Sequence, residues 1–301
     1  MSTLRELLAR KQVLVADGAW GTLLQAGGLE PGECPELWNV THPEAVRSIA
    51  AAYVAAGSDL ILTNTFGGSP LTLRRHGLEA RTEELNAAGV GLSLEAARQT
   101  EVLVAASIGP TGELIAPLGT CSAAELEEAF RRQVRALVKA GVRILCIETM
   151  ISLEEAACAV RAARQAEQEL GVALEVMATL TYGPVPGGFR TVMGASIPDT
   201  VTELARAGAD VLGSNCGNGI EHMVAIAREF RAATRLPLMI QANAGLPKSV
   251  AGRAVYDETP EFLAGKAREL LAIGVSVIGG CCGTTPEHIR ALRAMVDDTR
   301  R

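Results

Sequence analysis

A helix-glycine-strand unit recurs along the chain. In each copy an alanine-rich amphipathic helix ends at a glycine, and a short run rich in β-branched residues then leads to a polar or glycine-rich tip. The clearest copies are Gly57 with residues 59–62, Gly141 with 143–147, Gly208 with 210–212 and Gly274 with 275–278. Further runs of this kind lie at residues 13–16, 101–105, 174–178 and 237–240. Eight strands that alternate with helices predict a (β/α)8 TIM barrel, and a doubly wound open sheet is the alternative.

Local signals along the chain agree with this arrangement. The strand runs are apolar throughout rather than alternating, which is typical of a parallel sheet buried on both faces. Ser152 with Glu155 predicts a capping box at the start of a helix. Pro43, Pro260 and Pro286 stand where the first turn of a helix accepts proline.

The bulk composition limits the possible functions. A chain of 301 residues with 48% hydrophobic and 21% charged residues can bury a large core. It contains no long linker rich in Gly, Ser or Pro, so we predict a single domain over residues 1–301, with long functional loops at 27–39 and 182–198. A net charge of -6 and an aromatic content of 3% argue against nucleic acid as a partner.

Targeting signals and a disulfide framework are also missing from the sequence. Residues 1–12 lack the apolar core of a signal peptide, and no apolar run approaches the length of a membrane span. The cysteines number seven, and four of them are scattered in a way that suits a reducing compartment and predicts small hydrophobic or surface thiols. These four are Cys34, Cys121, Cys146 and Cys158. We therefore expect a cytoplasmic protein without a membrane partner.

The expected strand tips are rich in residues that can bind a metal or a substrate. In a (β/α)8 barrel the active site lies at the C-terminal ends of the strands. The tips are, in chain order, Asp17-Gly18, Thr63-Asn64-Thr65-Phe66, Glu148-Thr149, Asn215-Cys216, Asn243 and Cys281-Cys282. If the fold is a barrel, these residues converge on one rim.

Cys216, Cys281 and Cys282 offer three thiolates for one metal ion. Three sulfur ligands on a tetrahedral Zn²⁺ leave one position open, and an open position distinguishes a catalytic zinc from a closed structural one. Neighbouring cysteines on a strand point to opposite faces, so Cys281 and Cys282 can share a metal only beyond the strand end, where the flanking glycines free the backbone. The alternatives for this pair are a strained vicinal disulfide or two buried thiols.

Other polar residues of the rim have two interpretations each. Asp17 and Glu148 are expected on opposite sides of the rim, where they could hold a substrate ammonium through charge-assisted hydrogen bonds; Asp17 could instead be a turn residue. The side-chain oxygen of Asn243 could fill the fourth zinc position until a substrate thiol displaces it, or could merely bond the loop. The histidines fall within or at the starts of predicted helices, where we expect solvent-facing or capping roles. They are His42, His76, His222 and His288.

Together these motifs resemble the homocysteine S-methyltransferase family, which includes the homocysteine domain of cobalamin-dependent methionine synthase and betaine–homocysteine methyltransferase. The resemblance covers nearly the whole chain and is most specific in the paired cysteines that follow the Asn-Cys motif. The matching segments are residues 17–22, 63–66, 148–149, 215–217, 243–247 and 279–284.

The resemblance implies a zinc-bearing barrel with Cys216, Cys281 and Cys282 as ligands. It also implies that Asp17 and Glu148 bind the amine of L-homocysteine. Backbone amides near Gly18 to Trp20 would hold the amino-acid carboxylate, and Thr65, Asn215 and Asn243 are included among the substrate-binding residues.

The expected activity is therefore a zinc-dependent transfer of a methyl group to homocysteine, which forms methionine. A free thiol titrates near pH ~8.5, and coordination to zinc deprotonates it. Three cysteinates and the zinc-bound substrate thiolate would keep the reacting sulfur electron-rich enough to attack a methyl group.

The methyl donor is not identified by these motifs. The expected donor is methylcobalamin on a separate corrinoid protein, because 301 residues leave no room for a further domain. S-methylmethionine or another sulfonium compound ranks second. A betaine-type donor would need an aromatic cage, for which the candidates are Trp20, Trp38, Tyr182 and Phe189.

Two rival classes remain open from the sequence. A thiol–disulfide oxidoreductase that uses Cys281-Cys282 would keep its activity in the presence of chelators. A zinc-binding scaffold without turnover would bind the metal but not homocysteine. The sequence also leaves open another thiol substrate, the direction of transfer and the oligomeric state.

Overall fold

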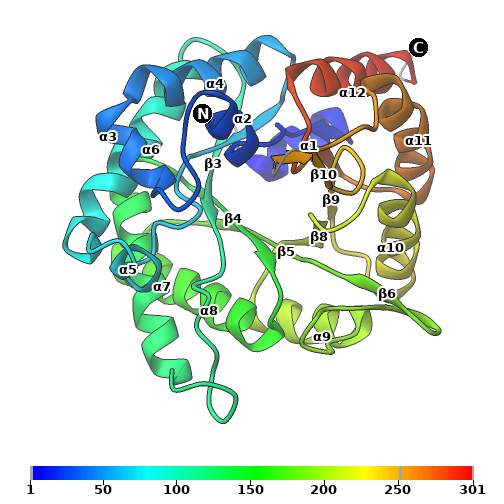
Figure 1. The fold of residues 1–301 in the computed structure, drawn as a ribbon. Coiled ribbons are helices and arrows are strands. Elements are labelled where there is room, and N and C mark those ends of the chain that lie inside the picture. The colour runs from blue at the N-terminus through cyan, green and yellow to red at the C-terminus, as the bar shows by residue number, and fades with distance from the viewer. Residues whose placement is uncertain (1–2, 251–252, 300–301) are drawn as a thin grey trace.

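Parallel strands close into a barrel in the computed structural model, which describes residues 3–250 and 253–299 (Figure 1). Around the barrel the order is β1-β12-β9-β8-β5-β4-β3-β2, and a bridge between Ala16 and Leu60 joins β2 to β1. The barrel strands are β1 (Leu14–Val15), β2 (Leu60–Leu62), β3 (Leu103–Ile108), β4 (Ile144–Met150), β5 (Glu175–Leu180), β8 (Val211–Asn215), β9 (Leu238–Ala242) and β12 (Val277–Gly280). The predicted (β/α)8 fold is confirmed, and the bridge rules out the open sheet.

Helices surround the barrel and cover its outer face (Figure 1). The larger ones are α4 (Pro43–Ala55), α6 (Thr82–Ala96), α7 (Ala123–Lys139), α8 (Leu153–Leu170), α9 (Ile197–Ala207), α10 (Ile220–Ala233), α11 (Pro260–Ile273) and α12 (Pro286–Asp298). The shorter ones are α1 (Leu4–Lys11), α2 (Gly21–Ala26), α3 (Trp38–Thr41) and α5 (Pro70–Arg74), with the 3-10 turns η1 (Pro35–Leu37) and η2 (Glu79–Arg81). As predicted, Pro43, Pro260 and Pro286 open their helices. In the described part of the chain, none of the helices has the length and apolarity needed to cross a membrane.

The strands divide the apolar core into two parts. Side chains alternate along a strand, so Val15 and Leu145 pack against the outer helices while Leu14 and Ile144 fill the barrel lumen. Leu7 of α1 joins the lumen cluster and is 1% exposed. Helix α1 therefore closes the N-terminal end of the barrel as an apolar plug. Full burial of a leucine such as Leu7 contributes roughly 1.5–3 kcal/mol to stability.

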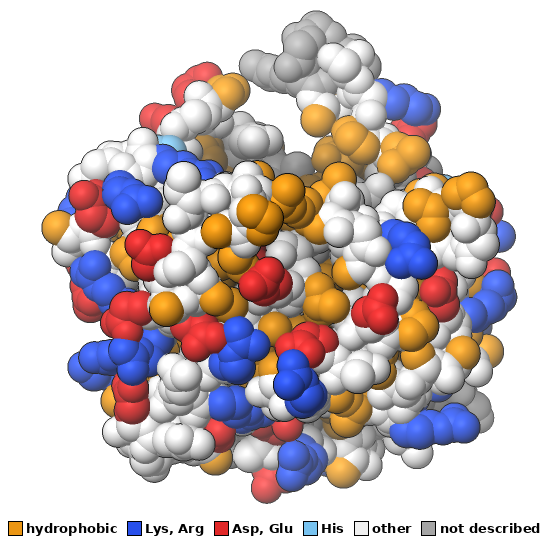
Figure 2. All heavy atoms as spheres, turned by 90° about the horizontal axis from the view of Figure 1, so that it is seen from below, with side chains coloured by type: hydrophobic (Ala, Val, Ile, Leu, Met, Phe, Trp, Pro, Cys, Tyr) orange, Lys and Arg blue, Asp and Glu red, His pale blue; other side chains and the backbone are white. Residues whose placement is uncertain are grey.

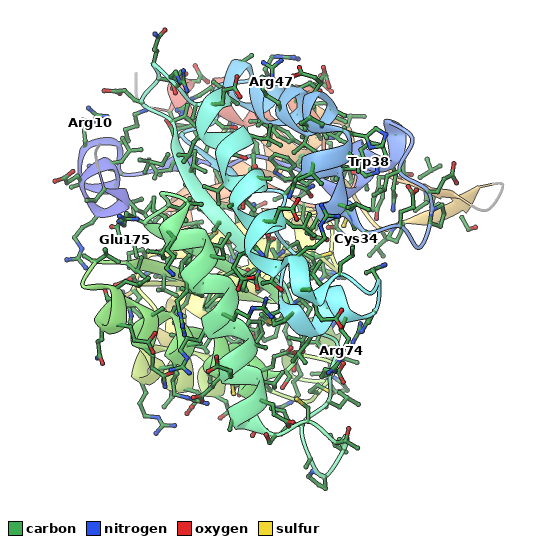
Figure 3. All side chains as sticks on the ribbon, turned by 90° about the vertical axis from the view of Figure 1, so that its left-hand side faces the viewer. Arg10, Cys34, Trp38, Arg47, Arg74 and Glu175 are labelled. Carbon is green, nitrogen blue, oxygen red and sulfur yellow. The ribbon has the colours of Figure 1, made fainter. Side chains whose placement is uncertain are left out.

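Polar contacts fix α1 at this closed end. The carboxylate of Glu175, at the start of β5, accepts hydrogen bonds from the backbone amides of Leu4 (2.7 Å) and Arg5 (2.8 Å). A negative charge at these free amides also suits the helix dipole. Figure 3 shows Glu175 and Arg10 at this end of the molecule and a hairpin projecting from the opposite end.

Two hairpins lie in the loops that follow barrel strands. The loop after β5 contains β6 (Gly183–Val185) paired with β7 (Gly188–Arg190), and the loop after β9 contains β10 (Lys248–Val250) paired with β11 (Arg253–Val255). The first of these lies within the long loop predicted at residues 182–198. The other predicted long loop, residues 27–39, contains η1 and the start of α3.

Two details of the sequence prediction need correction. Most strands extend two or three residues beyond the predicted runs, so that Glu148 and Asn215 belong to strands rather than to loops. The capping box at Ser152 is only half present: Ser152 Oγ accepts from the Glu155 amide, but the Glu155 carboxylate accepts from the amide and hydroxyl of Thr111, each at 2.7 Å. Glu155 and Thr111 are both buried, so these bonds satisfy groups that water cannot reach. They also tie α8 to the loop after β3.

The outer surface carries charges of both signs. Figure 2 shows acidic and basic side chains interspersed rather than gathered by sign on the face it presents. Ion pairs between neighbouring helices account for part of this pattern, as where Arg131 of α7 lies 2.7 Å from Glu169 of α8. Exposed pairs of this kind contribute little to stability, about 0–1 kcal/mol each.

Candidate active site

Three thiols meet at the C-terminal rim of the barrel. Cys216 follows β8, and Cys281 and Cys282 follow β12. Their sulfur atoms lie within 4.8 Å of one another, and the Sγ atoms of Cys216 and Cys282 are 3.7 Å apart. Within residues 3–250 and 253–299, no second group of three or more His, Cys, Asp or Glu side chains is arranged to hold a metal ion.

This sulfur cluster has the dimensions of a zinc site. With Zn–S bonds of about 2.3 Å, a tetrahedron places two sulfur ligands about 3.8 Å apart. The distance between Cys216 and Cys282 agrees with this value and is far longer than a disulfide bond of about 2.05 Å. The three cysteines are free thiols. The donor set therefore fits Zn²⁺ with a fourth position left for another ligand.

The backbone at both strand ends is shaped to bring the thiols together. Cys216 has φ of 63°, in the left-handed region that costs a non-glycine residue on the order of 1–3 kcal/mol. Gly283 has φ of 80°, and a Cβ on it would lie 2.1 Å from the ring of Tyr256. A Cβ on Gly280 would lie 2.2 Å from Oγ1 of Thr284. The glycine at 283 thus supplies the turn, whereas the glycine at 280, inside β12, supplies close packing.

The thiols interact strongly with one another. Hydrogen bonds from Cys216 and Cys281 lower the pKa of Cys282 to about 3. Hydrogen bonds with Cys216 and Cys282 raise the pKa of Cys281 well above its ordinary value. The cluster thus holds one thiolate that its neighbours stabilise, and thiolate is the form that binds a metal.

Asp17 lies buried at the end of β1 and has one oxygen without a partner. Its Oδ2 accepts hydrogen bonds from Trp20 Nε1 (2.8 Å) and the Leu62 amide (2.7 Å). Among the described residues no group bonds its Oδ1. Burial raises the pKa of Asp17 to about 7 despite these two bonds. A carboxylate so placed would gain from a cation brought by a ligand.

Glu148 is connected to the thiols through Asn215. Oε1 of Glu148 accepts from Ser107 Oγ (2.5 Å), and Oε2 accepts from Asn215 Nδ2 (3.1 Å). The same Asn215 nitrogen lies 3.7 Å from Cys281 Sγ. Burial raises the pKa of Glu148 to about 7, and the negative charge of Asp17 adds to this effect. The two carboxylates therefore repel each other electrostatically across the barrel mouth.

Asn215 is fully buried and bonded to protein groups on both of its amide atoms. Its Oδ1 accepts from the Thr149 amide (2.7 Å) and Thr179 Oγ1 (2.8 Å), and its Nδ2 also donates to Thr149 Oγ1 (2.6 Å). Thr149 has φ of 60°, which is a second strained position at the rim. In this geometry Asn215 orients Glu148 and the cysteine loop.

The other residues predicted from the sequence lie near the same mouth with different surroundings. The Thr65 hydroxyl donates to the Ser107 carbonyl (2.8 Å), so it ties the loop after β2 to strand β3. A Cβ on Gly18 would lie 2.6 Å from Thr284 Oγ1, which also accepts from the Ala19 amide (3.2 Å). The side-chain oxygen of Asn243 is buried, and no described group bonds it.

Some residues of the site were not predicted from the sequence. Ser107, Thr179 and Thr284 are ordinary small polar residues whose role depends on bonds to Glu148, Asn215 and Ala19. Tyr256, from the loop after β11, packs on Gly283, and its pKa is raised to about 12 by burial and by the charge on Cys282. Tyr256 follows the hairpin strand β11, which the sequence did not predict, so no sequence signal indicated it.

The aromatic residues considered for a cage are mostly used in packing. Trp38 stacks on His42 with ring centroids 4.3 Å apart, and Tyr182 packs edge-on against Phe230. Both side chains are buried, and the indole of Trp20 is bonded to Asp17. These positions do not form an open cage for a quaternary ammonium.

The histidines have the surface and capping roles predicted for them. Those at positions 42, 76 and 222 are exposed. His288 is buried in the first turn of α12, where Nδ1 accepts from the Thr285 amide (3.1 Å) and Nε2 lies 2.9 Å from the Glu258 carbonyl. This histidine anchors the end of the loop that carries Tyr256.

Comparison with known proteins agrees with the geometry of the site. Residues 14–296 match the family model described as homocysteine S-methyltransferase. The methionine synthases of Mycobacterium tuberculosis and Mycobacterium leprae are 32% and 31% identical to the chain, over 97% of its length and 25% of theirs. The chain therefore spans about a quarter of the length of these curated relatives.

Solved structures give a match over the full length of a single protein. The homocysteine methyltransferase MmuM from Escherichia coli, in its metallated form, superposes with a TM-score of 0.78 and 28% identity, and the match covers 97% of this chain and 99% of that one. Its oxidised form gives a TM-score of 0.77 with 27% identity and similar coverage.

Proposed function

Because the chain belongs to the homocysteine S-methyltransferase family, we propose that it transfers a methyl group to the thiol of L-homocysteine and forms methionine. In this proposal Cys216, Cys281 and Cys282 hold a zinc ion. The observation that carries it is the meeting of three free thiols, within 4.8 Å of one another, with two buried carboxylates at one barrel mouth.

The cysteines would prepare the substrate thiol. When bound, Zn²⁺ supplies the Lewis acidity that lowers the pKa of a coordinated thiol, so that the sulfur is ionised at neutral pH. Asn215 holds the cysteine loop beside Glu148, because its Nδ2 donates to the Glu148 carboxylate and lies 3.7 Å from Cys281 Sγ. Asn243 is placed at the same mouth with an unbonded oxygen, which agrees with a role as a replaceable ligand.

The two carboxylates would bind the substrate ammonium. Asp17 offers an unbonded Oδ1, and Glu148 is held in place by Ser107 and Asn215. Both have a pKa near 7 in the free protein, so a bound cation would favour their ionised forms and strengthen its own binding. This pair would select an amino-acid thiol over a simple alkyl thiol.

The transfer itself is a nucleophilic displacement. The substrate thiol gives up its proton to solvent, its sulfur forms a bond to the methyl carbon, and the bond between that carbon and the donor breaks with its electron pair left on the donor. With methylcobalamin as donor, the electron pair of the broken bond would stay on the corrinoid, which would leave in its reduced form.

We propose that the donor is methylcobalamin on a separate corrinoid protein. Most of the exposed large hydrophobic side chains in the described residues lie on loops that follow barrel strands, and such groups favour docking of a protein. They are Phe66, Leu114, Leu118, Ile151, Val185, Val192, Met193, Leu246 and Val255.

A small sulfonium donor is the second candidate. It agrees with the match to MmuM, a homocysteine methyltransferase of which the matched region covers 99%, because a small donor needs no further domain. A betaine donor has less support, since Trp38 and Tyr182 are buried in packing.

Zinc-edge X-ray absorption with and without L-homocysteine tests the thiol part of the proposal. We expect three sulfur atoms around the metal in the free protein and four after homocysteine is added. An unchanged shell would favour a zinc-binding scaffold, and a protein that binds no zinc would favour a thiol–disulfide oxidoreductase.

A donor panel tests the rest. Methionine formation is measured with methylcobalamin on a corrinoid protein, free methylcobalamin, S-methylmethionine and betaine, each with and without a chelator. We expect the corrinoid protein to give the highest rate and the chelator to abolish it. A higher rate with S-methylmethionine would replace the corrinoid proposal, and turnover that resists the chelator would contradict the role of zinc.

A further inference from the structure

Three buried side-chain oxygens at the barrel mouth have no hydrogen-bond donor among the residues described by the structure: Asp17 Oδ1, Asn243 Oδ1 and Gln241 Oε1. A buried acceptor left without a donor costs about 1–3 kcal/mol. The proposed function gives roles to the first two. Gln241 has no role in it, although its side chain is only 2% exposed.

Strand geometry directs Gln241 into the barrel lumen. Along β9, Met239 packs in the lumen cluster, whereas Ile240 and Ala242 pack against the outer helices. Since side chains alternate along a strand, Gln241 points to the same side as Met239, one step closer to the open rim. It is level with Asn215 on β8 and with Gly279 on β12.

The neighbours of Gln241 place it beside both the thiols and Asp17. Its carbonyl accepts from the Cys216 amide (3.2 Å), and its Nε2 points toward the Gly280 carbonyl (3.4 Å), which turns Oε1 away from β12. A Cβ on Gly279 would lie 3.3 Å from Gln241 Cγ and 2.8 Å from the Asp17 carbonyl. The glycine at 279 thus leaves open the space between Gln241 and Asp17.

We infer that Gln241 Oε1 accepts a hydrogen bond from the ammonium group of the substrate and so helps to select an amino-acid thiol. This inference rests on the proposed function. Once its thiol is ionised, homocysteine has only its ammonium N–H groups left to donate, so an unbonded acceptor in the lumen can pair with no other group of the substrate.

The amide of Gln241 suits this position better than a third carboxylate. Asp17 and Glu148 already have a pKa raised to about 7, and each charge disfavours the other. A neutral acceptor binds an ammonium N–H without adding to that repulsion.

The test compares two thiols in the zinc-loaded protein and in its Gln241→Met variant. L-homocysteine carries the ammonium group, and 4-mercaptobutanoate is the same molecule without it. Isothermal titration calorimetry measures both dissociation constants, and urea unfolding measures stability. We expect the variant to bind homocysteine about 10- to 100-fold more weakly, to bind 4-mercaptobutanoate unchanged, and to be at least as stable as the parent.

Two further variants serve as controls for the position and the chemistry of the acceptor. Gln133→Met removes another buried glutamine with an unbonded Oε1, but from α7 outside the lumen; it should leave the ratio of the two affinities unchanged. Gln241→Glu keeps an acceptor at the same position and should retain preference for homocysteine.

Equal weakening of both thiols in Gln241→Met, or no change in either, overturns the inference. A loss of preference in Gln241→Glu as large as in Gln241→Met overturns it too. If the parent protein does not bind homocysteine at all, the proposed function itself fails, and this is seen before any variant is measured.

Discussion

The two ends of the barrel are built on the same strands but have opposite chemistry. At the N-terminal end, Leu4 and Leu7 of α1 fill the lumen, and Glu175 bonds the free amides at the start of the helix. At the C-terminal end, the lumen is lined by carboxylates, amides and thiols, several of them without a partner among the described residues. The alternation of side chains is the same at both ends, so the difference comes from the residue types at the strand ends and from the helix α1 that covers one of them.

The open end holds buried polar groups that reduce the stability of the folded protein. Asp17 and Glu148, whose pKa values are raised by burial, lie at this end. Backbone strain is found at both ends, at Thr149 and Cys216 here and at Gln12 and Gln99 in the turns before β1 and β3. The buried lumen oxygens that lack a partner among the described residues are therefore concentrated at the open end, where a ligand could satisfy them.

Loss of a thiol at the open end should have the largest effect. In Cys282→Ser we expect zinc content to fall from about one ion per chain to well below half, because the metal loses one of its three sulfur ligands. The loss in kcat/KM should exceed the roughly 10- to 100-fold that follows removal of a group that only supports a ligand. Metal analysis and methionine formation measure the two effects.

Cys158→Ala provides the control for this variant. Cys158 is a buried free thiol of α8, away from the rim. It should keep zinc and activity while losing some stability. Equal zinc loss in both variants would contradict the assignment of the site.

Truncation of a side chain at the closed end should lower stability and leave activity almost unchanged. Leu7→Ala removes a fully buried side chain of the plug and should lower the free energy of unfolding by about 2–5 kcal/mol. Below the unfolding transition, kcat/KM should stay within about twofold of the parent because the rim is unchanged. Urea denaturation measures the loss of stability, and an activity assay at low temperature measures kcat/KM. A large loss of zinc affinity in this variant would show that the closed end affects the metal site.

A change at Asp17 should affect function and stability in opposite directions. Asn at this position keeps an oxygen for the bonds from Trp20 and Leu62 but carries no charge. We expect KM for homocysteine to rise by about 10- to 100-fold, as for a lost hydrogen bond to a charged group.

The stability effect of Asp17→Asn depends on pH. The pKa of Asp17 is raised from 3.8 to about 7, so the parent protein is fully stabilised below pH 3.8 and loses stability as pH rises through about 7. The variant lacks this loss. Its thermal midpoint should exceed that of the parent by a few degrees at pH 8 and by much less at pH 4; a difference that does not vary with pH would argue against a raised pKa.

The smallest effect is expected from Glu175→Gln at the closed end. The change removes a charge that faces the N-terminus of α1 and should cost about 0.3–1 kcal/mol, a loss that added salt reduces. Activity should not change. Urea unfolding at low and high ionic strength measures the effect, and an equal cost in both would assign it to hydrogen bonding rather than charge.

Several features of the molecule were predictable from the sequence. The apolar runs and the glycines at helix ends predicted all eight barrel strands, because burial on both faces requires an apolar run and a helix C-terminus favours glycine. The positions of Asp17, Glu148, Cys216 and the Cys281-Cys282 pair at strand tips followed from the fold, because parallel strands bring their C-terminal ends to one rim.

Partners of single side chains were not predictable in the same way. Ser152 with Glu155 had the pattern of a capping box, yet the Glu155 carboxylate bonds Thr111, which is distant in sequence. Asn215 was predicted as a substrate-binding residue, and the structure shows its amide bonded to Thr149, Thr179 and Glu148.

The sequence by itself determined the order of strands and helices and which residue types stand at the rim, since these depend on local periodicity and on the chain order. The tertiary structure decided which of those groups meet, which are bonded, and which, like Gln241 Oε1, stay unbonded. The reason is physical: burial, pKa and hydrogen-bond pairing depend on neighbours that the closed barrel brings from distant parts of the chain.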